Sequence, residues 1–379
     1  DIDLIYLSHL HPDHYDDRFF DFPKDTPIVI LDHGENFLRK ILSRNGYNNL
    51  IGVNDRGTVT FKEFELSLFA PWQNYAFEDY EHAHIQSIVG NLIDSAILVR
   101  TKNYSIFNFN DNKPDLDACR YIKNKYGKID LALLNYNAAN CYPACFNNLN
   151  DEEKKSEKDR IIVRNFDNMI ELINELEPST VMPFAGSYIL GGKEHEKNKY
   201  LASDKAENCK NYISNRVRAN VINLSEKNQY DLKSRTIQGS FADFSEQQAE
   251  DLVQNNLKNL KYPYEGDPMP NVDTLIEDVK KASINMKNKI KEFGASCKTD
   301  VSIKIGHAFV EVNRSSDAEK IHLECSMDIR LLRRILDRKA NWNNAEIGAH
   351  INFIRTPNIN EPDIHTALQF LHLPKNQRR

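Results

Sequence analysis

The sequence has few cysteines and no closely spaced thiol pair of the C-x-x-C type. It contains 6 cysteines among 379 residues, and only Cys141 and Cys145 lie near each other. Such a pattern favours free thiols in a cytoplasmic protein over a framework of disulfides. The C-x-H and C-x-x-H ligand pattern of a Rieske iron–sulfur cluster is also absent, so this stretch of chain is not expected to hold that cluster.

Long apolar runs and an excess of basic residues are absent as well. The apolar runs are too short to span a bilayer and no signal peptide is recognisable, so we expect no membrane partner. The formal net charge is −6, which argues against nucleic acid binding through a broad basic surface. Apolar residues make up 40% and charged residues 27% of the chain. This balance is ordinary for a globular protein with room for one large domain and a smaller one.

Metal-binding residue types are concentrated directly after the first apolar stretch. Residues 4–7 predict a strand, and His9, His11, Asp13 and His14 follow it. His9 and His11 lie on one side of an extended backbone, where they can share a metal. Asp13 and His14 can serve a second metal, or can act in catalysis by holding an attacking water beside the first. The alternative, scattered surface histidines, fits poorly because 3 of the 12 histidines fall in this short loop.

The spacing H-x-H-x-D-H at a strand end resembles the hallmark of the metallo-β-lactamase fold. The resemblance implies an α/β fold of the αββα sandwich type, in which two sheets lie between layers of helices. Several strands precede this loop in that fold, and the sequence starts with Asp1 inside an expected strand. We therefore expect N-terminal strands of the fold to be missing. The motif indicates the fold and says little about the substrate.

Two further regions are candidates for metal ligation. The fold supplies a third histidine from the loop before a strand such as residues 95–99, and either His82 or His84 fits this role. We favour His84, while a solvated loop histidine stays open as the alternative. Residues 105–110 predict a strand that ends at Asp111, where the fold commonly uses a carboxylate to bind one metal or bridge two. Such a carboxylate suits Zn²⁺ and Fe²⁺ equally, although Asp111 could also merely cap a turn.

One histidine of the standard pattern is not present. The strand predicted at residues 180–184 is followed by Ala185 and Gly186, where the pattern places its next metal histidine, and the nearest histidine is His195. This departure argues against a standard site with two zinc ions. It favours a site with a single metal, either mononuclear iron or zinc.

A loop rich in amides follows the buried strand predicted at residues 129–134. Asn135, Asn137 and Asn140 lie in it, and amide side chains both donate and accept hydrogen bonds. This loop suits recognition of a polar small molecule. Tyr188, which follows the next strand, is a further candidate for substrate binding.

A second lobe is expected toward the C-terminus. The stretch 261–271 contains three prolines and one glycine, which is typical of a linker. We therefore predict a metal-binding domain over residues 1–262 and an α+β lobe over residues 272–379.

Four segments together resemble the CMP-N-acetylneuraminate hydroxylase family, a branch of the metallo-β-lactamase fold. They are residues 107–111 (FNFND), the loop 135–146 that ends in CYPACF, residues 183–186 (PFAG), and a tail with Trp342, 346–348 (EIG), 362–365 (PDIH) and 371–374 (LHLP). Members of this family carry an N-terminal Rieske domain and hydroxylate the N-acetyl group of a nucleotide-activated sialic acid. The resemblance implies that a Rieske [2Fe-2S] cluster lies in a missing N-terminal domain or on a partner chain.

Three functions are therefore considered. In the first, His9, His11 and Asp111 hold a mononuclear iron of a monooxygenase, with His14 or His84 nearby and the amide loop and Tyr188 facing a nucleotide sugar. An electron-transfer partner is then expected. In the second, the chain is a hydrolase of a phosphoester or lactone, and Asp13 orients or deprotonates a metal-bound water. The third is a catalytically inactive sugar-binding module.

Overall fold

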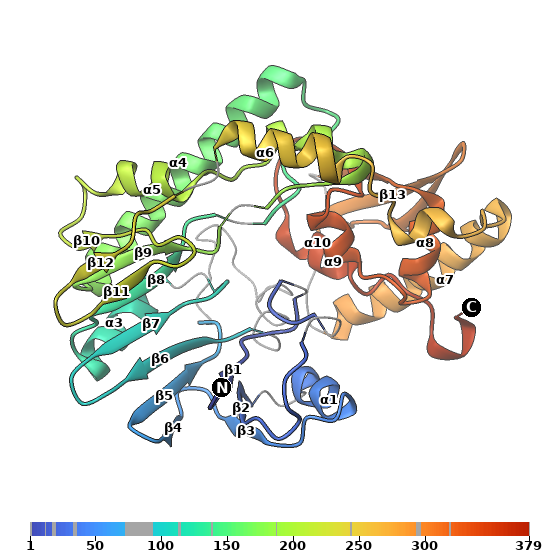
Figure 1. Ribbon diagram of the computed structural model, residues 1–379. Coiled ribbons are helices and arrows are strands. Elements are labelled where there is room, and N and C mark those ends of the chain that lie inside the picture. The colour runs from blue at the N-terminus through green and yellow to red at the C-terminus, as the bar shows by residue number, and fades with distance from the viewer. Residues whose placement is uncertain are drawn as a thin grey trace.

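Two β-sheets pack face to face and have helices on their outer sides (Figure 1). The computed structural model describes residues 2–11, 13–16, 20–32, 36–72, 94–112, 115–137, 139–186, 188–242, 245–292, 297–317 and 320–378. The smaller sheet has three parallel strands, β1 (Ile5–Tyr6), β2 (Ile28–Leu31) and β3 (Leu50–Val53).

The larger sheet has seven strands in the order β10-β9-β8-β7-β6-β5-β4. Their bounds are β4 (Thr58–Phe61), β5 (Phe64–Phe69), β6 (Ala96–Arg100), β7 (Ser105–Asn108), β8 (Leu131–Asn135), β9 (Thr180–Phe184) and β10 (Asn220–Val221). Strands β4 to β7 pair in antiparallel fashion, whereas β7 to β10 are parallel. The carboxyl ends of β7, β8 and β9 therefore share one edge of the sheet, and the segments that follow them can contribute to one site.

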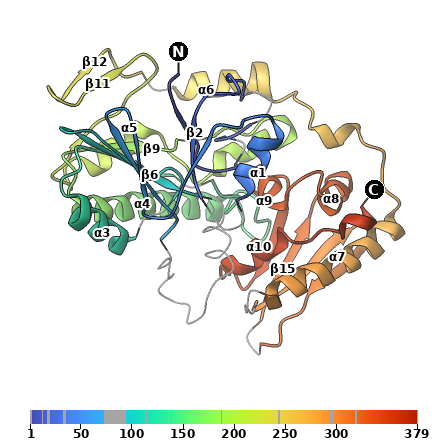
Figure 2. The ribbon, with the colours of Figure 1, turned by 90° about the horizontal axis from the view of Figure 1, so that it is seen from below.

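The side chains of β2 show how the layers are held together. Val29 and Leu31 pack against the larger sheet, whereas Ile28 and Ile30 pack against helix α1 (Phe37–Arg44). A strand buried on both faces needs a continuous apolar run, which explains the sequence IVIL. The outer face of the larger sheet is covered by helices (Figure 2). These are α3 (Leu116–Tyr126), α4 (Asp151–Leu176) and α5 (Ala206–Ile213). The predicted αββα sandwich is confirmed.

The C-terminal lobe is a four-stranded sheet with helices. The strands, in the order β14-β13-β15-β16, are β13 (Thr299–Ile305), β14 (Ala308–Asn313), β15 (Ile321–Ser326) and β16 (Asn352–Thr356). The helices are α7 (Val272–Glu292), α8 (Ile329–Leu336), α9 (Trp342–Ile347) and α10 (Pro362–Leu368), and a short 3₁₀ turn covers Lys375–Gln377. The predicted α+β character of this lobe agrees with these elements.

The two lobes share part of one hydrophobic core. Cys141, Cys145 and Phe146 of the amide loop are buried among the residues of the C-terminal sheet and helices. The Phe146 ring stacks on Phe353 at 5.2 Å between centroids, and the Asn147 N–H donates to the Phe353 carbonyl at 2.7 Å. The lobes are thus joined by packed side chains as well as by the chain, and the domain boundaries stay a prediction.

The connecting region is ordered in short elements. They are the 3₁₀ helix Gly192–Tyr200, the hairpin β11 (Gln229–Asp231) and β12 (Thr236–Gln238), α6 (Glu246–Leu252) with a π-helical turn Val253–Leu257, and the 3₁₀ helix Pro263–Gly266. Within the proline-rich stretch expected to be a linker, Tyr264 is buried in the C-terminal core. This stretch is therefore attached to the C-terminal lobe rather than exposed along its whole length.

The periodicity of the apolar residues predicts helices over residues 160–176 and 366–373, and the structure differs from both. Helix α4 starts at Asp151 instead of residue 160 because Asn150 and Glu153 form a capping box. Helix α10 spans Pro362–Leu368 rather than 366–373, since proline is well accommodated in the first turn of a helix. None of the helices that the structure describes combines the length and the apolar character needed to cross a membrane.

Candidate metal centre

The histidine loop begins where β1 leaves the smaller sheet and turns back on itself. The N–H groups of His14 and Tyr15 both donate to the His11 carbonyl, at 2.9 and 2.8 Å. This turn brings the ring of His14 onto that of His9, with 4.1 Å between their centroids. His9 is fully buried, so its ring has a fixed environment on every side.

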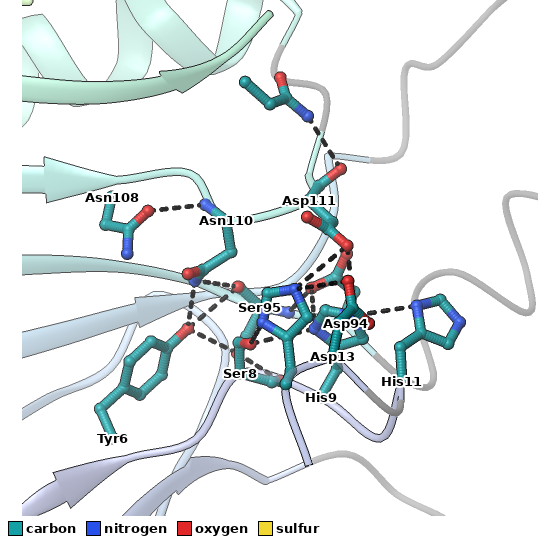
Figure 3. A network of polar contacts seen from close by, with 12 residues as sticks. Tyr6, Ser8, His9, His11, Asp13, Asp94, Ser95, Asn108, Asn110 and Asp111 are labelled. Atoms are coloured by element: carbon teal, nitrogen blue, oxygen red, sulfur yellow. Dashed lines mark hydrogen bonds and ion pairs between the residues drawn. The ribbon is translucent and has the colours of Figure 1, made fainter. Parts of the chain in front are cut away.

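Asp111 reaches the same point from the end of β7. Asn110 adopts a left-handed backbone conformation with φ +52°, which asparagine tolerates better than most residues. The Asn110 N–H donates to the Asn108 side chain at 2.9 Å, and the Asn110 amide donates to the Tyr6 hydroxyl at 3.0 Å and to the Ser95 carbonyl at 2.9 Å. The resulting turn directs the Asp111 carboxylate at the histidine loop (Figure 3).

The donor atoms form two overlapping groups, each with atoms within 4.8 Å of one another. In the first group, His9 Nε2 lies 2.9 Å from His11 Nδ1 and 3.5 Å from Asp111 Oδ2. In the second, His14 Nε2 lies 3.3 Å from the same Asp111 oxygen and 3.7 Å from Asp13 Oδ2. The structure thus brings together all four loop residues singled out in the sequence with Asp111, which belongs to both groups.

The pKa shifts of Asp111 and His11 favour the forms that bind metals, whereas that of His14 favours the protonated imidazole, whose proton a metal would have to displace. Burial would raise the pKa of Asp111, but hydrogen bonds with His14 and His9 hold it well below its usual range. Burial, together with the neighbouring His9, lowers the pKa of His11. Burial would also lower the pKa of His14, yet the Asp111 carboxylate raises it. An ionised carboxylate and neutral imidazoles are the forms that bind metals, so the residues fit a Zn²⁺ or Fe²⁺ ion.

Two residues that support the site were missed in the sequence. The Asp94 carboxylate lies 3.4 Å from His9 Nδ1, and burial raises the pKa of Asp94 to about 6, although His9 opposes this. The Ser8 hydroxyl lies 3.0 Å from His9 Nδ1 and 3.2 Å from His14 Nδ1. An acidic residue directly before β6 was the available signal for Asp94. For Ser8 the only signal was its place beside the first histidine.

The amide residues proposed to contact a substrate differ in how their side chains are used. Asn135 donates to the Asp111 carbonyl at 3.2 Å and so borders the candidate metal centre. Asn137 is buried, and its amide donates to the Asp204 carbonyl at 2.9 Å and accepts from the Asp204 N–H at 3.1 Å. The side chain of Asn137 therefore holds the loop in place.

The other candidates lie at the ends of β8 and β9. Asn140 is exposed, and its carbonyl accepts the Tyr188 hydroxyl at 3.3 Å.

Ala185 takes a left-handed conformation with φ +57°, which is strained for a residue other than glycine. His195 Nδ1 donates to the Gly192 carbonyl at 2.9 Å, and His195 belongs to neither metal group. His82 and His84 lie outside the described residues.

Comparison with known proteins gives a partial match. No family model matches the chain. The chain is 28% identical over 151 residues to a protein described as a Rieske 2Fe-2S iron–sulfur protein from Mycolicibacterium smegmatis, a match that covers 38% of this chain and 26% of that protein. A protein of the same description from Mycobacterium tuberculosis is 28% identical over 154 residues, with 38% and 26% covered. The match thus spans about a quarter of the length of these curated relatives.

Solved structures with similar arrangements include metal enzymes. The diiron β-hydroxylase CmlA from Streptomyces venezuelae is 15% identical, with 59% of this chain and 44% of that chain covered and a TM-score of 0.37. A possible metal-dependent hydrolase from Veillonella parvula is 11% identical, with 59% and 74% covered and a TM-score of 0.40. The metallo-β-lactamase fold protein YhfI from Bacillus subtilis is 12% identical, with 59% and 74% covered and a TM-score of 0.35. These scores are too low to carry an argument, so the fold assignment rests on the layers and strand order described above.

Proposed function

We propose that this chain is the catalytic portion of a metal-dependent monooxygenase of the CMP-N-acetylneuraminate hydroxylase type. The observation that carries the proposal is the first donor group, in which His9, His11 and Asp111 place two imidazole nitrogens and one carboxylate oxygen around one point. Two histidines and one carboxylate leave coordination positions open, an arrangement that suits non-haem iron and O₂. A nucleotide-activated sialic acid or a related sugar is the proposed substrate.

A Rieske [2Fe-2S] centre is the proposed source of electrons. Support comes from the similarity to proteins described as Rieske 2Fe-2S iron–sulfur proteins. The sequence contains no C-x-H and C-x-x-H pattern of its own, so the centre would be held by another part of the protein or by a partner chain. The cysteines that the structure describes are all free, which supports the further proposal of a reducing, cytoplasmic location.

The chain's own residues would hold and orient the reacting groups. An iron bound at this centre would supply the oxygen chemistry. His9 and Asp111 fix one side of the centre, while Asn135 holds the backbone of Asp111. His14 Nε2 lies 3.3 Å from the same Asp111 oxygen that faces His9 and helps to hold the carboxylate in place. Asn140 and Tyr188 would then contact the sugar.

A single-turnover experiment tests this proposal. The protein is loaded with Fe²⁺ without oxygen, supplied with a chemical reductant, and then mixed with O₂ and a CMP-sialic acid. We expect a product that has gained one oxygen atom, measured by mass spectrometry, and none with the His11→Ala variant. Absence of product and of O₂ consumption in protein that retains iron would contradict the oxygenase.

A hydrolase is the second candidate because of the second donor group. Asp13 and His14 share Asp111 with the first group, and two neighbouring metals bridged by a carboxylate suit hydrolysis of phosphoesters. Asp13 would then orient or deprotonate the attacking water. Turnover of a phosphodiester with Zn²⁺ or Mn²⁺ and no reductant would support this function, and inertness with Zn²⁺, Mn²⁺ and Fe²⁺ would contradict it. A protein that binds no metal but binds the sugar would support the inactive binding module.

A further inference from the structure

Ser8 lies between two histidines that belong to different donor groups. Its hydroxyl oxygen is 3.0 Å from Nδ1 of His9, a member of the first group, and 3.2 Å from Nδ1 of His14, a member of the second. Ser8 and His9 are both buried. One side chain therefore contacts a ring from each of the two candidate metal positions.

The geometry separates the two nitrogens of each ring. The Nε2 atoms of His9 and His14 face Asp111, at 3.5 and 3.3 Å, whereas both Nδ1 atoms face Ser8. A hydroxyl oxygen has two lone pairs and can accept two N–H bonds at once. If both Nδ1 atoms carry the proton, both Nε2 lone pairs are available to a metal. A ligating histidine usually donates its other N–H to such a partner.

The backbone of Ser8 is fixed by Ser95, the residue directly before β6. Its carbonyl accepts the Ser95 hydroxyl at 2.9 Å, and Ser95 is bonded to the Tyr6 hydroxyl at 2.8 Å. In Figure 3, Tyr6, Ser95 and Asn110 lie on one side of His9, and His11 lies on its other side. The hydroxyl of Ser8 is therefore held at the rings by the joined ends of β1 and β6.

Among the described residues, Asp94 forms an ion pair with only one of the two rings and reaches the other through its longer-range charge. Its carboxylate lies 3.4 Å from His9 Nδ1, and in the described part of the chain it makes no ion pair with His14. The Ser95 N–H donates to Asp94 at 2.7 Å and keeps the carboxylate in place. Loss of Asp94 should therefore affect the first position much more than the second.

We propose that Ser8 is a positioning residue that couples the two metal positions by fixing the tautomers of His9 and His14, and that Asp94 chiefly reinforces His9. The inference rests on the proposed metal centre and adds which neighbouring residue supports which histidine. Removal of the Ser8 hydroxyl weakens both positions together. Removal of the Asp94 charge weakens metal binding at the first position.

The test is a titration of the full chain with Co²⁺ alone, followed by its visible spectrum and by metal analysis. We expect two binding steps in the wild type, one for each donor group, although the proposed oxygenase needs an iron only in the first. Ser8→Ala should weaken both steps by roughly 10- to 100-fold, the usual effect of losing a partner of a ligating histidine. Asp94→Asn should weaken one step by a similar factor and leave the other within threefold.

Matched controls separate positioning from general damage. Ser67→Ala removes a buried hydroxyl of β5 that bonds Thr58 at 2.7 Å, and Asp130→Asn alters a carboxylate that accepts the Ser105 N–H at 3.0 Å. Both should bind Co²⁺ like the wild type. Ser8→Thr keeps a hydroxyl and should retain both steps. Nitrogen-15 chemical shifts of the metal-free protein should show Nδ1 protonated in both rings, and a tautomer mixture in Ser8→Ala.

The outcomes are distinct. A wild type that binds no metal would overturn the proposed metal centre itself. A wild type that binds metal but shows only one step, or a Ser8→Ala protein that keeps both steps unchanged, would overturn the coupling while leaving the metal centre intact. Equal losses in Ser8→Ala and Ser8→Thr would also overturn it, because volume rather than the hydroxyl would then decide.

Discussion

The C-terminal lobe and the candidate metal centre both hold carboxylates that are wholly or partly buried, but they balance the charge in different ways. On helix α8, Arg333 pairs with Asp278 at 2.7 Å and with Asp337 at 2.8 Å. At the candidate metal centre, the ion pairs that the structure describes for Asp94 and Asp111 are all to histidines. A guanidinium is always charged, whereas an imidazole is charged only when protonated.

The difference shows which region is complete without a ligand. The arginine-lined cavity of about 310 Å³ beside α8 contains Arg330 and Arg334, yet these pair with Asp328 at 2.6 Å and with Asp267 at 2.9 Å. Its charges are already balanced within the protein. Around Asp111, imidazoles and a carboxylate meet without an arginine or lysine among the described residues, so a metal ion would complete the balance.

The largest expected effect comes from Asp111→Ala, because Asp111 belongs to both donor groups. Loss of this ligand should abolish metal retention at both positions. The affinity should fall by more than the roughly 10- to 100-fold that follows loss of an outer partner. Metal analysis after gel filtration measures the result. Wild-type metal content in Asp111→Ala would show that the two groups do not bind metal as described.

Arg333→Ala should break the charge balance of the C-terminal lobe instead. Two buried carboxylates would lose their arginine, so the free energy of unfolding should fall by about 3 kcal/mol, measured by urea denaturation. Metal affinity should not change. The control Arg314→Ala removes an exposed pair with Glu311 and should change stability by less than about 0.5 kcal/mol. Equal losses of stability in Arg333→Ala and Arg314→Ala would contradict the role of Arg333 in balancing buried charge.

Two amides of one loop sharpen the comparison further. Asn137→Ala removes both hydrogen bonds to the Asp204 backbone and should lower the free energy of unfolding by about 1 kcal/mol, with substrate affinity unchanged. Asn140→Ala should lower substrate affinity, since the Asn140 side chain is exposed and is proposed to contact substrate. It should change stability less, because the hydrogen bond that it accepts from the Tyr142 N–H at 2.8 Å is exposed. Thermal denaturation and substrate binding are measured on both variants. If Asn137→Ala weakened substrate binding and Asn140→Ala lowered stability, the two roles would be the other way round.

The smallest effect is a pH dependence of the C-terminal lobe. A hydrogen bond from Arg330 lowers the pKa of Asp328 to about 2, although burial opposes the shift. A depressed pKa in the folded protein stabilises it above the unfolded pKa of about 4, and this contribution is lost as the pH falls toward 2.

Asp328→Asn isolates this contribution, because asparagine can still cap α8 as Asp328 does. The variant should melt below the wild type at pH 5, and the difference should shrink as the pH approaches 2. A difference that stays constant with pH would assign the effect to packing or capping.

Local sequence patterns were enough for the layers and for most strands. The alternation and apolar runs of strands such as β5 and β9 are local properties, so their positions follow from sequence. The H-x-H-x-D-H spacing and the carboxylate after β7 were likewise visible. The structure brings these donors together, and their role as metal ligands stays a prediction. The hydroxylase branch, carried by short segments of sequence, stays a proposal.

Contacts between distant segments could not be derived in this way. Ser8 and Ser95 meet across 87 positions of sequence, and no local pattern states that β1 and β6 end side by side. The same holds for Phe146, whose apolar neighbours belong to the C-terminal sheet. Asp94 comes within 3.4 Å of His9 only through the fold. Sequence thus predicted the donor groups of the candidate metal centre better than the residues that hold those groups in place.

The measurement that tests the central claim most directly is X-ray absorption of the metal-loaded wild-type chain. We predict a coordination shell of nitrogen and oxygen atoms at about 2.0–2.2 Å with the scattering pattern of imidazole, lost in Asp111→Ala. A shell containing sulfur at about 2.3 Å would place the metal at the buried cysteines instead. That result, or a chain that retains no metal, would contradict the assignment of the histidine loop.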